Sequence, residues 1–237
     1  MPDLYEKYSK DFIDNNLMGP NVLRLAEEVC RRLSLSPGMK VLDLGCGKAL
    51  SSIYLAKEFG VTVFATDLWI PAAENFARIK TMNVEHLVYP VHAEAHALPY
   101  ADDFFDAVVC FDAYHYFGTD ERYLNDFLIK LLKKGGQIGF AIPGFSRELS
   151  PQELQERGKY CSEGGADDLL GFHSKEWWQS FWDRINAVKD VRTFALACNR
   201  EAWEDWVNCP SPIGQDDKPF FENVKEIVTV GLVARKS

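Results

Sequence analysis

The sequence lacks several features that would place it in a specialised class of protein. None of its apolar runs approaches the roughly 20 residues that cross a bilayer, and residues 1–10 hold no apolar core of a signal peptide. It has no internal repeat and no low-complexity tract. We therefore expect a cytoplasmic globular protein.

Positive charge is also scarce. Lys and Arg number 26 against 35 Asp and Glu, so the 237-residue chain has a formal net charge of −9. This balance disfavours tight, sequence-independent binding to a phosphate backbone, and we expect no nucleic-acid partner. With 47% hydrophobic residues, the chain is long enough to bury one large core. We expect a single domain over residues 1–237, as a monomer or a homodimer.

The six cysteines form no CxxC pair and no cluster with histidine at the spacing of a zinc site. Their even number leaves a disulfide framework open, but Cys46, Cys110 and Cys198 lie in or beside apolar runs, where free cysteine acts as a small hydrophobe. We therefore expect reduced thiols. His92, Glu94 and His96 occur at alternate positions, so on a strand they would share one face as metal ligands can. However, they straddle the end of a predicted strand. No metal site is expected.

The chain does contain a regular alternation of short apolar runs with helical periods. The predicted strands of this region are 39–44, 61–66, 87–91, 107–111 and 137–142, and the predicted helices between them are 49–59, 71–81 and 120–132. Continuously apolar strands joined by helices indicate a parallel sheet with helices on both faces, which is an α/β fold.

Three parts of the single domain follow from this pattern. Residues 1–36 precede the alternation, residues 37–143 contain it, and residues 144–237 follow it with the last two strands. In the last part the predicted helices are 174–185 and 200–207, and the predicted strands are 191–197 and 225–234.

A glycine-punctuated turn follows the first predicted strand. The run Val41-Leu42-Asp43-Leu44-Gly45-Cys46-Gly47 leads from a buried strand into a turn that precedes a helix. Ligands of open parallel sheets bind at the carboxyl ends of the strands, and glycine allows them to approach the backbone. Asp67 ends the next strand, where a carboxylate can accept hydrogen bonds from both hydroxyls of a ribose. Together these residues predict a nucleoside site.

The turn departs from the dinucleotide-binding pattern. Leu50 occupies the position of the third glycine of GxGxxG, and Asp43 precedes the turn, where a carboxylate would repel a pyrophosphate. The same carboxylate suits S-adenosylmethionine, which carries an ammonium group and a sulfonium. A nicotinamide-dependent oxidoreductase and a non-catalytic cofactor-binding scaffold remain as alternatives.

The segment from about Met39 to Pro143 resembles the core of the class I S-adenosylmethionine-dependent methyltransferases. Residues 43–49 are similar to the family's first motif, DxGxGxG, with alanine for the last glycine, and residues 105–109 are similar to its FDxV motif. Residues 93–100 resemble the family's GDA…LPF segment, with glutamate for the aspartate. The resemblance implies that the cofactor is held by Asp43, Gly45, Cys46, Gly47, Asp67, Leu68, Glu94, Ala95 and Asp112.

The resemblance also implies a fold, an activity and a role for each part of the domain. Residues 1–36 are expected to form an N-terminal lid and helix, residues 37–143 a cofactor-binding core, and residues 144–237 an acceptor-side insertion with the last two strands. The fold is a three-layer αβα sandwich around a seven-stranded, mostly parallel sheet of order 3-2-1-4-5-7-6, with the seventh strand antiparallel. Residues 17–21, 66–69 and 112–118 are similar to a prokaryotic subgroup that methylates small molecules. The implied reaction is transfer of the methyl group of S-adenosylmethionine to a small-molecule nucleophile by in-line displacement, releasing S-adenosylhomocysteine. The acceptor atom, nitrogen, oxygen, sulfur or carbon, stays open.

In this family the loop after the fourth strand faces the methyl group. His115 is the candidate base of that loop, and Tyr114 or Tyr116 can orient a nucleophile, although a packed loop histidine explains His115 equally well. Asp112 can hold a cationic acceptor or contact the cofactor.

Aromatic residues outside the core are further candidates for the acceptor pocket. Tyr5 and Tyr8 can belong to an N-terminal lid that closes on ligand. Trp178, on the predicted helix 174–185, either lines the pocket or packs the helix onto the sheet.

Overall fold

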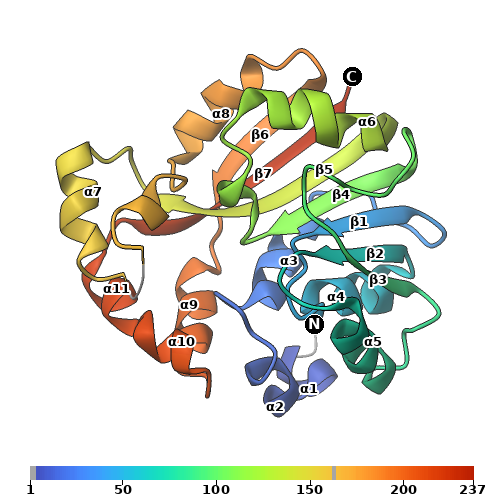
Figure 1. The fold of residues 1–237 in the computed structure, drawn as a ribbon, viewed down its shortest axis with the longest axis horizontal. Coiled ribbons are helices and arrows are strands. Elements are labelled where there is room, and N and C mark those ends of the chain that lie inside the picture. Colours follow the sequence, from blue (N-terminus) through green and yellow to red (C-terminus); the bar gives the residue numbers. More distant parts are fainter. Residues whose placement is uncertain (1–3, 162–163) are drawn as a thin grey trace.

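The structure is a computed structural model that describes residues 4–161 and 164–237. Seven strands form one sheet in the order β3-β2-β1-β4-β5-β7-β6 (Figure 1). The strands are β1 (Lys40–Leu44), β2 (Thr62–Asp67), β3 (Val88–His92), β4 (Phe105–Phe111), β5 (Leu132–Phe145), β6 (Val188–Ala195) and β7 (Ile227–Lys236). Strands β1 to β5 pair in parallel, whereas β7 is antiparallel to both of its neighbours. The predicted fold, with its reversed seventh strand, is confirmed.

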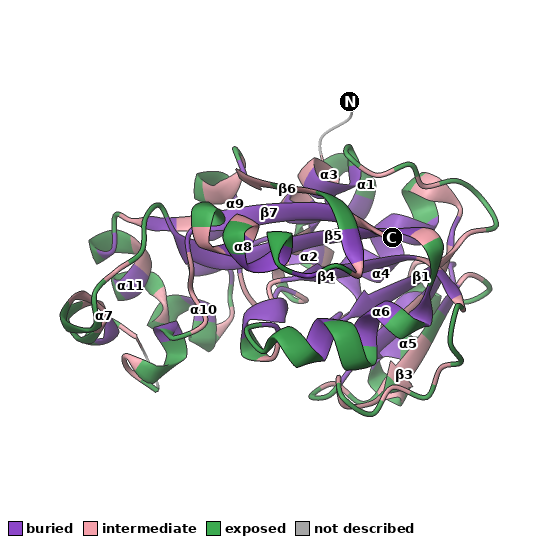
Figure 2. Cartoon of the chain, turned by 90° about the horizontal axis from the view of Figure 1, so that it is seen from above, coloured by how far each residue is buried: buried purple, intermediate pink, exposed green. Residues whose placement is uncertain are grey.

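Helices cover both faces of the sheet. One apolar cluster joins α3 and α4 to the sheet through Leu23 and Ile53, and a second joins α6 and α8 to the other face through Leu131 and Trp182. The helical elements are α1 (Leu4–Tyr8), α2 (Lys10–Asp14), α3 (Val22–Cys30), α4 (Leu50–Phe59), α5 (Ala72–Thr81), η1 (Tyr114–Tyr116), η2 (Tyr123–Leu128), α6 (Ile129–Leu131), α7 (Pro151–Gly158), η3 (Asp167–Leu169), α8 (Lys175–Asp183), α9 (Asn199–Val207), α10 (Pro212–Asp216) and α11 (Lys218–Asn223). Figure 2 shows the central strands buried between helices whose outer sides are exposed. Burial on both faces explains why the strands are continuously apolar.

Local signals in the sequence set several helix ends. Helix α4 ends before Gly60, which adopts the left-handed conformation (φ 63°) that glycine tolerates. Ser174 caps α8, because its Oγ accepts a hydrogen bond of 3.2 Å from the backbone N–H of Trp177. Both ends agree with the sequence pattern.

Two segments differ from the sequence expectation. Residues 120–132, predicted as one α-helix, contain the π-helix η2 followed by the short helix α6. Residues 145–171 show no helical period, yet they contain α7, which begins with a reciprocal capping box between Ser150 and Glu153. The capping pair was the available signal for α7, because its outward faces carry no apolar stripe.

Strands β5 and β7 are the longest pair in the sheet. Their ladder runs from Gln137 opposite Arg235 to Phe145 opposite Ile227, and the backbone N–H of Ser146 still donates to the carbonyl of Glu226 at 2.8 Å. The chain between these ends holds α7 to α11 and β6. Figure 1 shows α7, α10 and α11 beyond the end of this ladder, away from β3 and α5.

All six cysteines are unpaired. Over residues 4–161 and 164–237, no helix is both long and apolar enough to cross a membrane. Within the same ranges, no three His, Cys, Asp or Glu side chains gather as metal ligands would.

Candidate functional site

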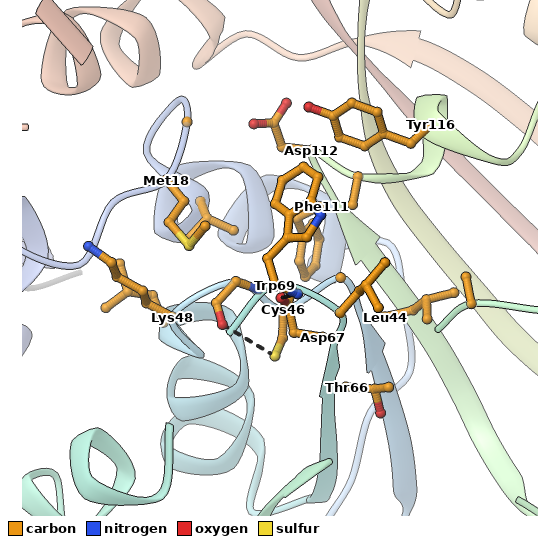
Figure 3. A pocket seen from close by; sticks show the side chains of 18 of the residues that line it. Met18, Leu44, Cys46, Lys48, Thr66, Asp67, Trp69, Phe111, Asp112 and Tyr116 are labelled. Carbon is orange, nitrogen blue, oxygen red and sulfur yellow. Dashed lines mark hydrogen bonds between the residues drawn. The ribbon is translucent and has the colours of Figure 1, made fainter. Parts of the chain in front are cut away.

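A cavity opens at the carboxyl ends of β1, β2 and β4. Its empty space, including the open mouth, is about 1020 Å³. The segments that line it are the glycine turn after β1, the end of β2, the loop after β3 and the loop after β4, and residues 16–20 close it from the N-terminal side (Figure 3). This is the edge of a parallel sheet at which ligands bind, and β1 lies between β2 and β4, where the strand order reverses.

The glycine turn depends on glycine at Gly45. Gly45 has a left-handed backbone (φ 69°), and a Cβ there would lie 2.5 Å from the Cβ of Ala113, on the facing loop. The N–H groups of Gly45 and Cys46 both donate to the carbonyl of Thr66, at 2.8 and 3.1 Å, so the turn is fixed against β2. Ala49, which stands where the family's last glycine is expected, is also left-handed (φ 62°). The strained backbone of that position is thus retained without its glycine.

Asp67 connects the glycine turn to the end of β2. Its Oδ2 accepts from the N–H of Gly47 at 2.8 Å, and its Oδ1 accepts from the N–H groups of Trp69 and Ile70 at 2.8 and 2.9 Å. The side chain lines the cavity, and a carboxylate has lone pairs left for ligand hydroxyls after accepting three bonds. The position agrees with the predicted ribose contact, and that role stays a prediction.

Asp43 lies below the turn and is not part of the cavity wall. It is fully buried, and its Oδ2 accepts hydrogen bonds of 2.6 Å from the hydroxyls of both Ser51 and Ser52 on α4. Burial raises the pKa of Asp43 to about 6, while the two serine hydroxyls act to lower it. The structure therefore gives no support to a direct contact between Asp43 and the cofactor. Asp43 instead holds the first turn of α4 against β1.

The wall after β2 and β3 contains residues that the family resemblance assigns to the cofactor, and that role stays a prediction. Leu68, Trp69, Glu94 and Ala95 line the cavity, and Leu68 and Trp69 are exposed. Both oxygens of Glu94 contact His96, at its backbone N–H and its Nδ1, and the hydrogen bond to the imidazole lowers the pKa of Glu94.

The loop after β4 contributes Asp112 and Tyr116 to the cavity wall. Asp112 has a left-handed backbone (φ 60°), and its N–H donates to the carbonyl of Ala141 at 2.8 Å. Burial, together with the negative charge of Asp217, raises the pKa of Asp112 to about 8. The Tyr116 ring meets the indole of Trp69 edge to face, with centroids 5.4 Å apart.

The structure places His115 and Tyr114 in the interior instead of at the cavity. The imidazole of His115 packs against Tyr116 and Phe172, and burial lowers its pKa to about 3. Tyr114 is fully buried against Phe140 and α8. Neither residue lines the cavity, so the geometry does not support the catalytic roles expected of them.

The aromatic residues expected to contact the acceptor also lie elsewhere. Tyr8 is buried beside Tyr54, and its hydroxyl donates to Glu58 Oε1 at 2.9 Å. Trp178 is fully buried in the cluster between α8 and the sheet. Tyr5 belongs to α1, but its side chain lies outside the described part of the structure. Of the predicted acceptor residues whose side chains the structure describes, Tyr116 alone lines the cavity.

The sequence predicts an N-terminal lid but not the residues of this segment that line the cavity. Met18 and Gly19 line it: the Sδ of Met18 would lie 3.1 Å from a Cβ at Gly47, and Asp112 Oδ2 would lie 2.1 Å from a Cβ at Gly19. Lys48 is the cationic residue of the wall, and its Nζ donates to the carbonyl of Asn15 at 3.1 Å. The available signal was the run 17–21, which carries the subgroup resemblance.

Comparisons with known proteins agree with this geometry. Residues 42–140 match the family model described as a methyltransferase domain. The chain is 30% identical to methyltransferase GfsG of Streptomyces halstedii over 50% of its own length and 42% of the relative's. It is 28% identical to a glycine/sarcosine/dimethylglycine N-methyltransferase of Actinopolyspora halophila over 65% of its own length and 27% of the relative's. The chain thus spans less than half the length of these curated relatives.

Solved structures share the fold at low identity. Geranyl diphosphate C-methyltransferase from Streptomyces coelicolor A3(2), solved with S-adenosyl-L-homocysteine, superimposes with a TM-score of 0.69 at 17% identity, covering 90% of this chain and 76% of that one. The [4+2]-cyclase SpnF superimposes with a TM-score of 0.70 at 17% identity, covering 91% and 81%. Residues 42–140 thus match a methyltransferase domain, and the sheet order and these superpositions show that the chain has the fold of these solved structures.

Proposed function

We propose that the protein transfers the methyl group of S-adenosylmethionine to a small-molecule acceptor in this cavity, by in-line displacement, and releases S-adenosylhomocysteine. One observation carries the proposal: a single cavity is bounded at one end by the glycine turn and Asp67 and at the other by Asp112 and Tyr116. A cofactor and an acceptor can therefore meet inside it.

The residues present fit the cofactor. A Cβ at Gly45 or Gly47 would meet a neighbouring side chain within 3.1 Å, so the turn leaves backbone, not side chains, facing the methionyl part. Asp67 has acceptor capacity for the ribose hydroxyls, and Leu68 and Ala95 offer apolar surface for the adenine.

When bound, the cofactor supplies an electrophilic methyl group on a sulfonium that leaves readily. The chain's own task is to align the nucleophile with that methyl group and to exclude water. Residues 16–20 and the Trp69–Tyr116 pair are placed for this task, since they enclose the cavity from two sides.

Calorimetric titration with S-adenosylhomocysteine and with NAD tests the proposal. We expect the wild-type protein to bind S-adenosylhomocysteine, and Asp67→Asn to weaken binding by about 10- to 150-fold, as expected for lost hydrogen bonds to a charged group. Glu74→Gln, on the exposed side of α5, is the matched control and should bind normally.

Three results would contradict the proposal in different ways. Absence of S-adenosylhomocysteine binding would end it. Tighter binding of NAD would favour an oxidoreductase. Binding without turnover of any acceptor, measured as S-adenosylhomocysteine release, would favour a non-catalytic scaffold.

A further inference from the structure

The charged side chains of the cavity wall differ in whether they have a hydrogen-bond partner within the protein. Four ionisable acidic or basic side chains line it, namely Lys48, Asp67, Glu94 and Asp112. The first three have protein partners: a backbone carbonyl, three backbone N–H groups and His96, respectively. Asp112 is different, because no group within residues 4–161 and 164–237 donates a hydrogen bond or forms an ion pair with its carboxylate.

The surroundings of Asp112 penalise its negative charge. The carboxylate is partly buried and rests against Gly19, and Asp217 adds a like charge nearby. These surroundings raise the pKa of Asp112 to about 8. A cation placed beside the carboxylate would remove the penalty, so the position favours positively charged ligands over neutral or negative ones.

Two aromatic rings complete the same end of the cavity. Trp69 and Tyr116 are both more than 60% exposed, although they contact each other edge to face. Figure 3 shows the indole of Trp69 extending towards the end of the cavity where Asp112 and Tyr116 lie. Ring faces beside a carboxylate bind organic ammonium groups, through cation–π attraction added to charge pairing.

Among the residues that the structure describes, no Lys or Arg lines this end. The cationic wall residue, Lys48, lies on the other side of the cavity, beside Asn15 (Figure 3). An acceptor that carries a carboxylate or a phosphate would therefore meet Asp112 with no compensating cation. We propose that the acceptor is an amine without an acidic group, with its nitrogen held between the Asp112 carboxylate and the rings of Trp69 and Tyr116.

This inference rests on the proposed function and adds its substrate class. The bound ammonium group first passes a proton to the Asp112 carboxylate, which frees the lone pair of the nitrogen. The nitrogen gives this lone pair to the methyl carbon, and the carbon–sulfur bond breaks with its electron pair remaining on sulfur. The products are the N-methylated ammonium ion, protonated Asp112 and neutral S-adenosylhomocysteine, so atoms and charge balance.

Matched probes test the substrate class. The amines 2-phenylethylamine and tryptamine are each compared with the amino acid that adds a carboxylate, phenylalanine or tryptophan, and with the alcohol that replaces the amine. Affinity is measured by calorimetry on protein saturated with S-adenosylhomocysteine. We expect at least one amine to bind about tenfold or more tightly than both of its partners, the scale of a hydrogen bond to a charged group.

Asp112→Asn identifies the group responsible. Asparagine tolerates the left-handed backbone of this position, so we expect the variant to fold. It should lose the preference for amines while its affinity for S-adenosylhomocysteine stays within about twofold of wild type, a difference below about 0.5 kcal/mol. Glu74→Gln, as the control, should change neither.

The outcomes separate this inference from the proposed function. If wild-type protein binds S-adenosylhomocysteine but no amine exceeds its amino-acid or alcohol partner, the substrate class is wrong and the proposed function stands. If Asp112→Asn weakens S-adenosylhomocysteine as much as the amine, Asp112 holds the cofactor's own ammonium group, and the inference is overturned. If wild type binds no S-adenosylhomocysteine, the proposed function itself fails.

Discussion

Replacing Gly45 by alanine tests whether the close approach of the glycine turn to the loop after β4 shapes the cavity. The new Cβ would lie 2.5 Å from the Cβ of Ala113, whereas carbon atoms in contact lie about 3.5–4.0 Å apart, so the two loops must separate by about 1 Å. Gly38 is the matched control, because its backbone is also left-handed (φ 87°) but nothing lies within 4 Å of its Cβ position.

The magnitudes follow from these two environments. A left-handed alanine costs about 1–2 kcal/mol, which applies to both variants. Overpacking adds about 1–3 kcal/mol at Gly45 alone. For a chain of this size, 1 kcal/mol lowers the melting temperature by about 2–4 °C. We therefore expect a loss of about 4–20 °C for Gly45→Ala and about 2–8 °C for Gly38→Ala.

Thermal unfolding and calorimetric titration of S-adenosylhomocysteine measure the two effects. Gly45→Ala should lose most of its affinity, because the turn moves, and Gly38→Ala should bind as wild type does. Equal losses of stability in the two variants, or unchanged binding by Gly45→Ala, would refute the reasoning.

Three further predictions concern stability and the cavity wall. In Asp43→Asn, the free energy of unfolding should match wild type near pH 4 apart from a constant offset. The free energy of unfolding of the variant should then rise relative to that of wild type by about 3 kcal/mol by pH 7, because the raised pKa of Asp43 makes its ionisation oppose folding. If urea unfolding gives the same difference between variant and wild type at both pH values, the reasoning is contradicted. Asp67→Ala should lower the free energy of unfolding by about 3 kcal/mol, since three backbone N–H groups lose their acceptor, against less than about 0.5 kcal/mol for the exposed Glu74→Ala; equal urea midpoints would be inconsistent with the anchoring role. Gly19→Ala should cost more free energy of amine binding than free energy of unfolding, because its Cβ would displace the Asp112 carboxylate without requiring a left-handed backbone. Unchanged amine affinity in calorimetry would contradict that contact.

The sheet and the cofactor end of the cavity could be predicted because their signals are local. Apolar runs mark strands that are buried on both faces, and the glycine turn with Asp67 lies within one β-α-β unit. The reversal of β7 came from the family resemblance, since an antiparallel strand buried on both faces has the same apolar pattern as a parallel one.

The acceptor end could not be predicted in the same way. Tyr114, His115 and Tyr116 are consecutive residues of one 3-10 turn, in which successive side chains point about 120° apart. Which of them faces the cavity depends on the packing of Tyr114 against Trp178 and Trp182, which are more than 60 positions away in the sequence. The composition of the turn does not fix its rotation, so two of the three candidate residues, Tyr114 and His115, are ones that the core buries.

The long β5–β7 ladder bears on how this chain can diversify. Because Ser146 and Glu226 are hydrogen-bonded neighbours, the chain between them is a long excursion from the sheet whose two ends are held together. The entropy of closing such an excursion changes by only about 0.6 kcal/mol when its length doubles. Lengthening or exchanging parts of it, with the tryptophans of α8 retained as its anchor, leaves the register of the ladder and the glycine turn in place. The ladder therefore fixes both ends of residues 147–225, so that the length of this segment can change at little entropic cost.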